Sequence, residues 1–145
     1  MEEPGGEADE RTAPLEIPSD ILAAMLAHCR RGDPLECCGI LGGVAPRVSS
    51  IHPLRNSDAS PVRYNADPRD LIAAVVALRA RGAEILAIYH SHPKHPAVPS
   101  KTDLRENHYG DVPRIIVSLL DPEPVVRIWR LDLETYEELD WQAVP

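Results

Sequence analysis

Two histidines and an aspartate between residues 90 and 103 have the types and the spacing of a metal site. His90 and His92 flank a single serine, and Asp103 follows in the next segment of the chain. In a strand, alternate side chains point to the same face, so both imidazoles would converge, with their Cα atoms roughly 6 to 7 Å apart. Two histidine nitrogens and one carboxylate oxygen leave one position of a tetrahedral zinc ion open for water, which is typical of a catalytic site.

The segments around these residues predict how they are held. Residues 84–90 read as a buried strand that delivers the two histidines, and Pro93 suits the end of such a strand. Ser100-Lys-Thr-Asp103 resembles a helix start, with Ser100 as N-cap and Asp103 one turn further on. Alone, this serine–aspartate pair predicts only a helix cap, and a lone His-x-His predicts ordinary histidines. Their coincidence favours the metal site.

An open metal position also needs a base, and Glu36 is the candidate. It stands at the mouth of the apolar stretch 37–43. Burial disfavours the charge of such a carboxylate and a nearby metal favours it, so the group would exchange protons near neutral pH. The alternative is a solvated loop charge before a strand.

Taken together, Glu36, the His90-Ser-His92-Pro run and the Ser100-x-x-Asp103 run resemble the complete signature of the JAMM metalloproteases. These are the catalytic branch of the MPN (Mov34/PAD-1) family. Segments 36–43, 56–64 and 67–70 resemble its small bacterial members, and the likeness spans about residues 17 to 131.

The resemblance implies a role for each signature residue. His90, His92 and Asp103 would bind one zinc ion per chain, and Glu36 would act as general acid and base. Ser100 would form hydrogen bonds in the site and support the developing oxyanion.

It also implies hydrolysis, by water that zinc and Glu36 activate, of an amide bond after the C-terminal Gly-Gly of a ubiquitin-like or sulfur-carrier protein. No residue selects among an isopeptide bond to lysine, a linear peptide bond and the release of one amino acid such as cysteine. A non-catalytic MPN scaffold is the alternative, but such proteins normally lack several ligands. A zinc deaminase would need His-x-Glu and Pro-Cys-x-x-Cys, and the chain has neither.

Periodicity predicts an α/β domain of α+β layers. The resemblance implies a curved mixed β-sheet flanked by helices, an architecture like that of the cytidine deaminases. The expected helices are 18–31, one opening at Asp67-Pro68, and a short one from Ser100; the expected strands are 38–42, 48–54, 84–90, 114–120 and 125–129. In the second helix we expect a broad buried stripe of Leu71, Ile72, Val75, Val76 and Leu78.

The substrate groove must come from the core of the domain. Only ten residues separate Asp103 from Arg114, which leaves no room for the long insertion that larger deubiquitinating relatives use to grip ubiquitin. We expect the groove to be lined by residues 56–66 and 94–99. Arg63 and Tyr64 would hold an extended peptide and His95 would contact substrate, although Arg63 is equally well explained as a solvated loop charge.

Charge and composition indicate the nature of the N-terminal segment and argue against binding to nucleic acid or a membrane. Residues 1–16 contain six acidic groups and one arginine, so they carry −5 of the net charge of −8, and we expect a disordered tail before a single domain at 17–145. No Lys/Arg stripe points to nucleic acid, and no apolar run is long enough for a membrane span.

The three cysteines, Cys29, Cys37 and Cys38, are an odd number and read as reduced, buried thiols of a cytoplasmic protein. Metal binding by Cys37 or Cys38 stays open, and so does a homodimer.

Overall fold

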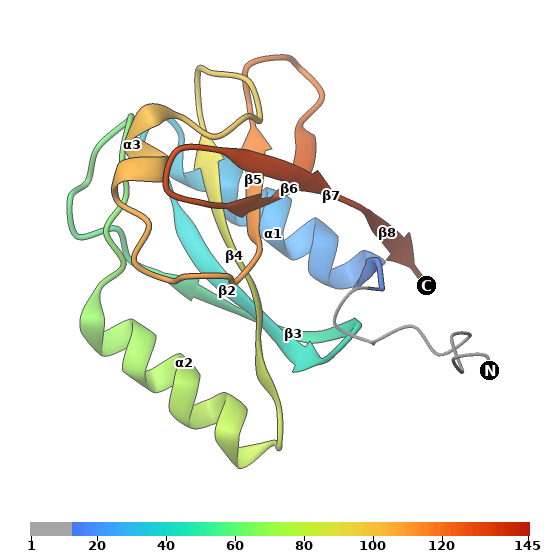
Figure 1. The fold of residues 1–145 in the computed structure, drawn as a ribbon. Coiled ribbons are helices and arrows are strands. Elements are labelled where there is room, and N and C mark those ends of the chain that lie inside the picture. Colours follow the sequence, from blue (N-terminus) through green and yellow to red (C-terminus); the bar gives the residue numbers. More distant parts are fainter. Residues whose placement is uncertain (1–12) are drawn as a thin grey trace.

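The computed structural model describes residues 13–145, in which eight strands form one curved mixed sheet with the order β7-β6-β5-β4-β2-β3-β1-β8 (Figure 1). The strands are β1 (Leu15–Pro18), β2 (Cys38–Val44), β3 (Arg47–Leu54), β4 (Glu84–His92), β5 (Arg114–Ser118), β6 (Val125–Leu131), β7 (Tyr136–Leu139) and β8 (Trp141–Val144). The helices are α1 (Ser19–Gly32), α2 (Pro68–Ala80) and α3 (Lys101–Arg105).

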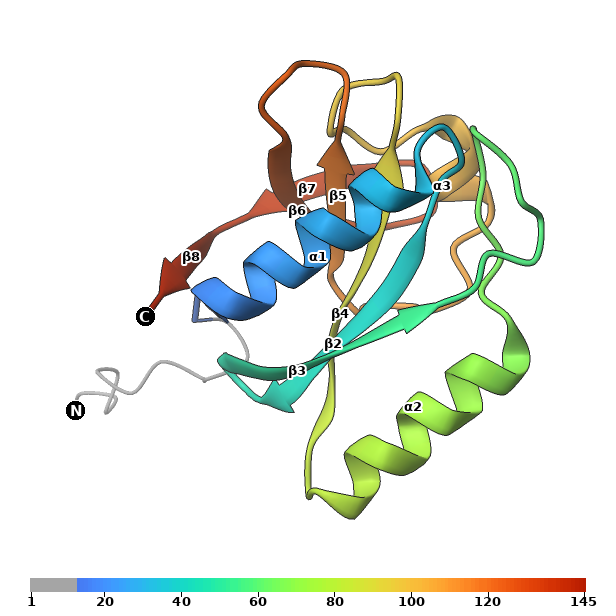
Figure 2. The same ribbon diagram turned by 180° about the vertical axis from the view of Figure 1, so that it is seen from behind.

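The two long helices pack against different faces of the sheet. Figure 2 shows α1 lying across the strands, where its buried Ile21, Met25 and Cys29 join one core cluster. On α2, Ala74 and Leu78 join a second cluster with Ile88 of β4. Because side chains alternate along a strand, β4 sends Tyr89 to the α1 cluster and Ile88 to the α2 cluster.

The central strand of the site is β4, which pairs antiparallel with β2 and parallel with β5. In this register His90 lies between Cys38 and Ile116. A strand held on both sides gives rigid support to the side chains at its carboxyl end. The expected mixed sheet flanked by helices is confirmed.

Both edges of the sheet are occupied by one continuous segment at the C-terminal end of the chain. β7 pairs with β6 at one edge and β8 pairs with β1 at the other, with only Asp140 between them. Long exposed strand edges invite pairing with other chains. The C-terminal segment therefore covers the edges of β6 and β1 with two edge strands of only four residues each.

Two expectations need correction, and two strands were missed. The tail was expected to run through residue 16, but Leu15 and Glu16 belong to β1, which pairs with β3 and β8; residues 1–12 lie outside the described residues. Ile72 and Val76 are 63% and 61% exposed, because α2 meets the sheet only along the stripe that Ala74 and Leu78 mark. β7 and β8 were not expected, since their exposed charged and polar residues hide the strand pattern.

None of the helices within residues 13–145 is long and apolar enough to span a membrane.

Candidate active site

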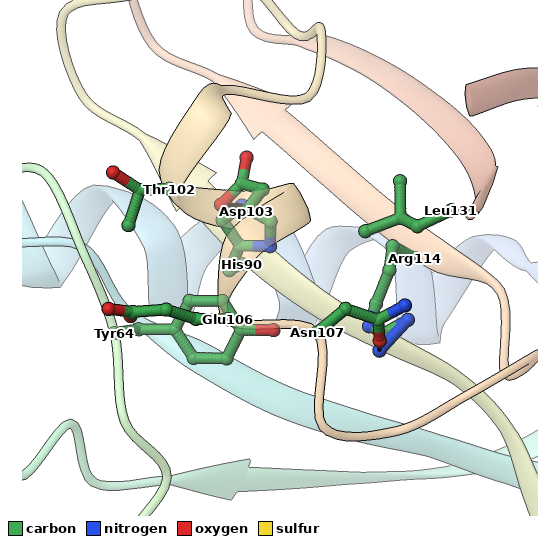
Figure 3. Close-up of a pocket in the computed structure, with 8 residues that line it drawn as sticks. All are labelled: Tyr64, His90, Thr102, Asp103, Glu106, Asn107, Arg114 and Leu131. Carbon is green, nitrogen blue, oxygen red and sulfur yellow. Dashed lines mark hydrogen bonds and ion pairs between the residues drawn. The ribbon is translucent and has the colours of Figure 1, made fainter. Parts of the chain in front are cut away.

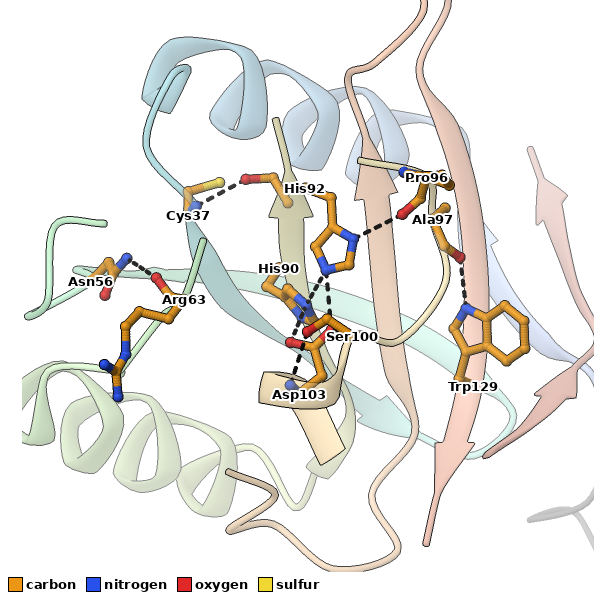
Figure 4. Close-up of polar contacts among 11 residues, drawn as sticks. Cys37, Asn56, Arg63, His90, His92, Pro96, Ala97, Ser100, Asp103 and Trp129 are labelled. Carbon is orange, nitrogen blue, oxygen red and sulfur yellow. Dashed lines mark hydrogen bonds and ion pairs between the residues drawn. The ribbon is translucent and has the colours of Figure 1, made fainter. Parts of the chain in front are cut away.

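The structure brings His90, His92 and Asp103 together at the end of β4 and the start of α3 (Figure 4). The two Nε2 atoms lie 3.2 Å apart. Asp103 places Oδ1 at 3.2 Å from His90 Nε2 and Oδ2 at 3.1 Å from His92 Nε2. All three side chains are buried. One face of a strand and one helical turn thus aim three donor atoms at a single point, as the spacing predicted.

Local hydrogen bonds orient each donor. The Pro96 carbonyl lies 2.8 Å from His92 Nδ1. Because a carbonyl only accepts, Nδ1 carries a ring proton, so Nε2 is the nitrogen that can bind a metal once it has no proton of its own. Asp103 is held by a capping box, in which its backbone N–H donates to Ser100 Oγ at 3.0 Å and its Oδ2 accepts from the Ser100 N–H at 2.9 Å. The predicted cap is therefore confirmed, and it also fixes the carboxylate.

The loop after His92 is pinned at three successive carbonyls. The His95 carbonyl accepts from Ser118 Oγ at 2.6 Å, and the Ala97 carbonyl accepts from the indole of Trp129 at 2.9 Å. Between them lies the Pro96 carbonyl that orients His92. The backbone that fixes the histidine is thus itself fixed by β5 and β6.

Electrostatics favours a bound cation at this point. Burial opposes the charge of Asp103, but the neighbouring His90 charge and the hydrogen bonds from both histidines and Ser100 hold the pKa of that carboxyl well below its usual range. Burial alone would lower the pKa of His92, yet the hydrogen bond and charge of Asp103 raise it. A divalent ion can replace the protons in this cluster, and two imidazoles with one carboxylate are donors that zinc accepts. The residues present therefore fit a metal ion.

Glu36 lies two residues before the start of β2 and is 4% exposed. Its Oε1 has no hydrogen-bond partner within the described residues. Burial raises the pKa of Glu36 to about 8; the charge of His92 opposes this rise and that of Asp103 adds to it. A buried carboxylate with a free oxygen and a raised pKa is suited to carry a proton at neutral pH.

Beside Glu36 opens a cleft of about 310 Å³. Its lining residues are Glu36, Val62, His92, His95, Pro96, Val98, Ser100 and Thr102. Glu36, His92 and Ser100 thus face the same space, and residues from both expected lining segments form its walls.

The three expected substrate contacts lie in different surroundings. His95 is exposed and lines the cleft. Arg63 forms ion pairs with Glu106 at 2.6 Å and Asp58 at 3.3 Å. Tyr64 stacks on the ring of His90, with centroids 4.6 Å apart and planes at 25°. This geometry gives Tyr64 a structural part in holding His90.

Tyr64 also borders a small cavity below the metal site, with His90, Asp103 and Arg114 (Figure 3). Arg114 is 1% exposed, and its guanidinium lies 5.1 Å from the centre of the Tyr109 ring. It donates to the Val112 carbonyl at 2.9 Å and to the Asn107 side chain. Within the described residues it has no ion pair, so this buried cation holds the loop after α3 through neutral groups.

Sequence reasoning missed the residues that hold the backbone around Glu36. The Glu36 N–H donates to the Ser60 carbonyl at 2.8 Å, and its own carbonyl accepts from Asn56 Nδ2 at 3.0 Å. The Cys37 N–H donates to Ser91 Oγ at 2.9 Å, and the Ser91 N–H returns to the Cys37 carbonyl at 3.0 Å. The only signal in the sequence was the position of Ser91 between the two histidines.

Comparison with known proteins gives a consistent result. The family described as prokaryotic homologs of the JAB domain matches residues 18–132. The chain is 42% identical over 103 residues to a TtuB-protein conjugate cleaving protease of Thermus thermophilus, covering 70% of this chain and 68% of the relative. It is 33% identical over 128 residues to the CysO-cysteine peptidase of Mycobacterium tuberculosis, covering 87% and 84%.

Solved structures agree on the fold. A protein from Desulfitobacterium hafniense superimposes with a TM-score of 0.83 at 32% identity, covering 90% of this chain and 92% of the other. A JAB1/MPN domain protein from Archaeoglobus fulgidus gives a TM-score of 0.60 at 18% identity, covering 91% and 99%. The second likeness concerns the fold alone.

Proposed function

Since this chain belongs to the family of prokaryotic homologs of the JAB domain, we propose that it is a zinc-dependent peptidase or isopeptidase acting on a ubiquitin-like or sulfur-carrier protein. Hydrolysis itself follows from the family, whose relatives here are peptidases. The proposal adds the metal, the residue roles and the substrate class.

One observation carries the proposal. The donors of His90, His92 and Asp103 converge, and His92 lines the same cleft as a buried carboxylate, Glu36, whose Oε1 has no partner among the described residues. A structural zinc site would be closed by a fourth protein ligand. Here no fourth His, Cys, Asp or Glu joins the group within residues 13–145. This arrangement supports an open site with its own base.

The residues then have distinct tasks. His90, His92 and Asp103 would hold the zinc ion, which when bound supplies a Lewis acid for the water and the scissile carbonyl. Glu36 accepts the proton of the attacking water and passes it to the leaving amine. Ser100 Oγ accepts the Asp103 N–H and still has its own hydrogen to donate to the oxyanion. A single such donor contributes about 3 to 4 kcal/mol in other hydrolases.

The shape of the cleft supports a slender substrate segment. Val62 and Val98 line it together with the catalytic groups, and no long insertion follows Asp103. A C-terminal Gly-Gly carries no side chains and suits such a space. One relative is named as a protease that cleaves TtuB-protein conjugates, and the other as a CysO-cysteine peptidase. We therefore infer a ubiquitin-like or sulfur-carrier protein as substrate, cut after its terminal Gly-Gly.

Three free and buried cysteines support a reducing, cytoplasmic location. None of them is in the metal-binding group that the described residues form. Cys38 instead directs its thiol toward the Leu54 carbonyl at 3.9 Å.

The test uses the purified full-length protein and ubiquitin-like carriers encoded in the same genome. Each carrier is prepared with a C-terminal peptide, an isopeptide-linked lysine or a single cysteine after its Gly-Gly. Intact mass should show loss of one of these groups, and a chelator should abolish it until zinc is restored. Equal cleavage with and without chelator would contradict the proposal, and so would no cleavage by fully zinc-loaded protein.

A further inference from the structure

We propose that Asn56 is a positioning residue of this site: its carboxamide holds the backbone of Glu36 and the neighbouring loop, residues 57–65, in one arrangement. The proposal rests on the function proposed above, because it assigns Asn56 a part in aligning the base of that reaction.

The Asn56 side chain makes four hydrogen bonds. Nδ2 donates to the carbonyls of Glu36 and Arg63, both at 3.0 Å. Oδ1 accepts from the backbone N–H groups of Asp58 at 3.0 Å and Asn65 at 2.9 Å. A carboxamide offers two donors and two acceptor lone pairs. Every one of them is used, and all four partners are backbone groups, so the orientation of the amide is defined.

These bonds leave Glu36 with no independent anchor at its own backbone. Its carbonyl is held by Asn56, and its N–H donates to the Ser60 carbonyl inside the same loop at 2.8 Å. The Oε1 atom of its side chain has no partner among the described residues. The position of that carboxylate therefore depends on the backbone, which the loop that Asn56 organises holds at Glu36 itself and Ser91 holds at the next residue, Cys37.

The same loop forms a wall of the cleft. Val62 lines it together with Val98, and the Arg63 carbonyl next to Val62 is one of the two groups that Asn56 Nδ2 holds. One side chain thus sets the distance between the base and the wall of the groove. Displacement of a reacting group by about 1 Å can cost about 100-fold in rate.

Asn56 lies outside the group of metal donors, which consists of His90, His92 and Asp103 within the described residues. Its loss should therefore leave the metal in place while it slows the reaction. Outer partners of metal ligands typically contribute about 10- to 100-fold, and we expect a partner of the base to contribute on the same scale.

The decisive variant is Asn56→Asp. It keeps an oxygen that accepts from the N–H groups of Asp58 and Asn65, but it replaces the Nδ2 donor with a second oxygen, so both bonds to carbonyls are lost. We expect kcat to fall about 10- to 100-fold, with full zinc content and with KM changed by less than about threefold. Gln142→Glu is the matched control: it makes the same amide-to-carboxylate change on an exposed side chain of β8 that does not line the cleft and forms no hydrogen bond within residues 13–145. That control should stay within about twofold of the wild type in kcat.

A second readout needs no substrate. In Asn56→Asp, exchange of the Glu36 amide hydrogen, followed by NMR, should be at least about tenfold faster, while amides of β4 keep their protection. A wild-type kcat together with an unchanged Glu36 amide in Asn56→Asp would overturn the proposal. General unfolding of Asn56→Asp would also overturn it, because the residue would then be structural. If the wild type cleaves no carrier but the exchange result holds, the proposed function fails and the positioning of Glu36 stands.

Discussion

Ser91 Oγ accepts a hydrogen bond from the backbone N–H of Cys37 at 2.9 Å, so the residue after the proposed base is tied to the residue between the two histidines. Ser91 is fully buried and points away from the metal donors of its own strand, since side chains alternate. This bond joins β4 to the segment that enters β2. The bond therefore fixes the position of Glu36 relative to the two histidines.

Ser91→Ala should therefore destabilise the protein. It leaves a buried N–H without an acceptor, which costs about 1 to 3 kcal/mol in the free energy of unfolding. Chemical denaturation should show this loss, whereas Ser49→Ala, at an exposed position of β3, should stay within about 0.5 kcal/mol of the wild type. Equal stability of both variants would remove Ser91 as a link between the two strands.

Metal binding and proton transfer should be separable by mutation. Glu36→Gln should retain zinc and lose about 100- to 10,000-fold in kcat, because only the proton acceptor is removed. His92→Ala should lose both zinc and activity, because one of the three converging donors is gone. Metal content is measured by elemental mass spectrometry. The matched control is His108→Ala, which removes an exposed histidine. Retained turnover in Glu36→Gln would rule out its role as base.

The buried carboxylate also predicts how stability depends on pH in the metal-free protein. The pKa of Glu36 is about 8 in the folded chain, against an ordinary 4.5. Between these values the folded state binds more protons than the unfolded state, so the free energy of unfolding falls as pH rises through this window. The amide that replaces the carboxyl group in Glu36→Gln does not titrate. The stability advantage of Glu36→Gln should therefore grow from about pH 4.5 to 8, by at most about 1.4 kcal/mol per pH unit.

Chemical denaturation of chelator-treated wild type and chelator-treated Glu36→Gln across that pH range measures the difference in their free energies of unfolding. In zinc-loaded samples the difference in unfolding free energy between the two proteins should be smaller, because a nearby cation favours the charged carboxylate. A stability gap that is constant with pH would mean that Glu36 is solvated in the folded protein.

A close approach between Gly39 and Tyr89 provides a test of the core behind the site. A Cβ atom at Gly39 would lie 2.3 Å from three atoms of the Tyr89 side chain. That ring is fully buried, and its hydroxyl lies 2.6 Å from His28 Nδ1, so it cannot swing aside without losing a hydrogen bond. Gly39→Ala should cost about 1 to 3 kcal/mol of stability. The same substitution should cost less in a Tyr89→Leu background, as a double-mutant cycle of denaturation would show.

Prediction from the sequence succeeded where the signal was local. The period of two in β4 placed both histidines on one face, and the Ser100 cap brought Asp103 toward them within a single helical turn. The helical periodicity of 18–31 predicted α1, which buries Ile21, Met25 and Cys29. Each of these features depends on neighbours within about one turn or a few strand residues.

Prediction failed where burial or pairing depends on distant segments. The apolar pattern of α2 did not show that Ile72 and Val76 face outward, because the buried part of the helix is decided by the distant strands it packs against. Likewise the polar strands β7 and β8 exist because β6 and β1 offer them edges to pair with.

The sequence by itself determined the family of this protein and predicted the chemistry of its site, with three metal donors and an acidic base. Local geometry was enough for the donors, because a strand and a helix cap each fix their own side chains. Tertiary structure alone decided what holds the base. Asn56 is 20 positions from Glu36, and Ser91 is 54 from Cys37; contacts over such separations arise only when the sheet assembles. The same burial in the folded chain gives Glu36 its raised pKa, since desolvation is a property of the surroundings and not of the residue.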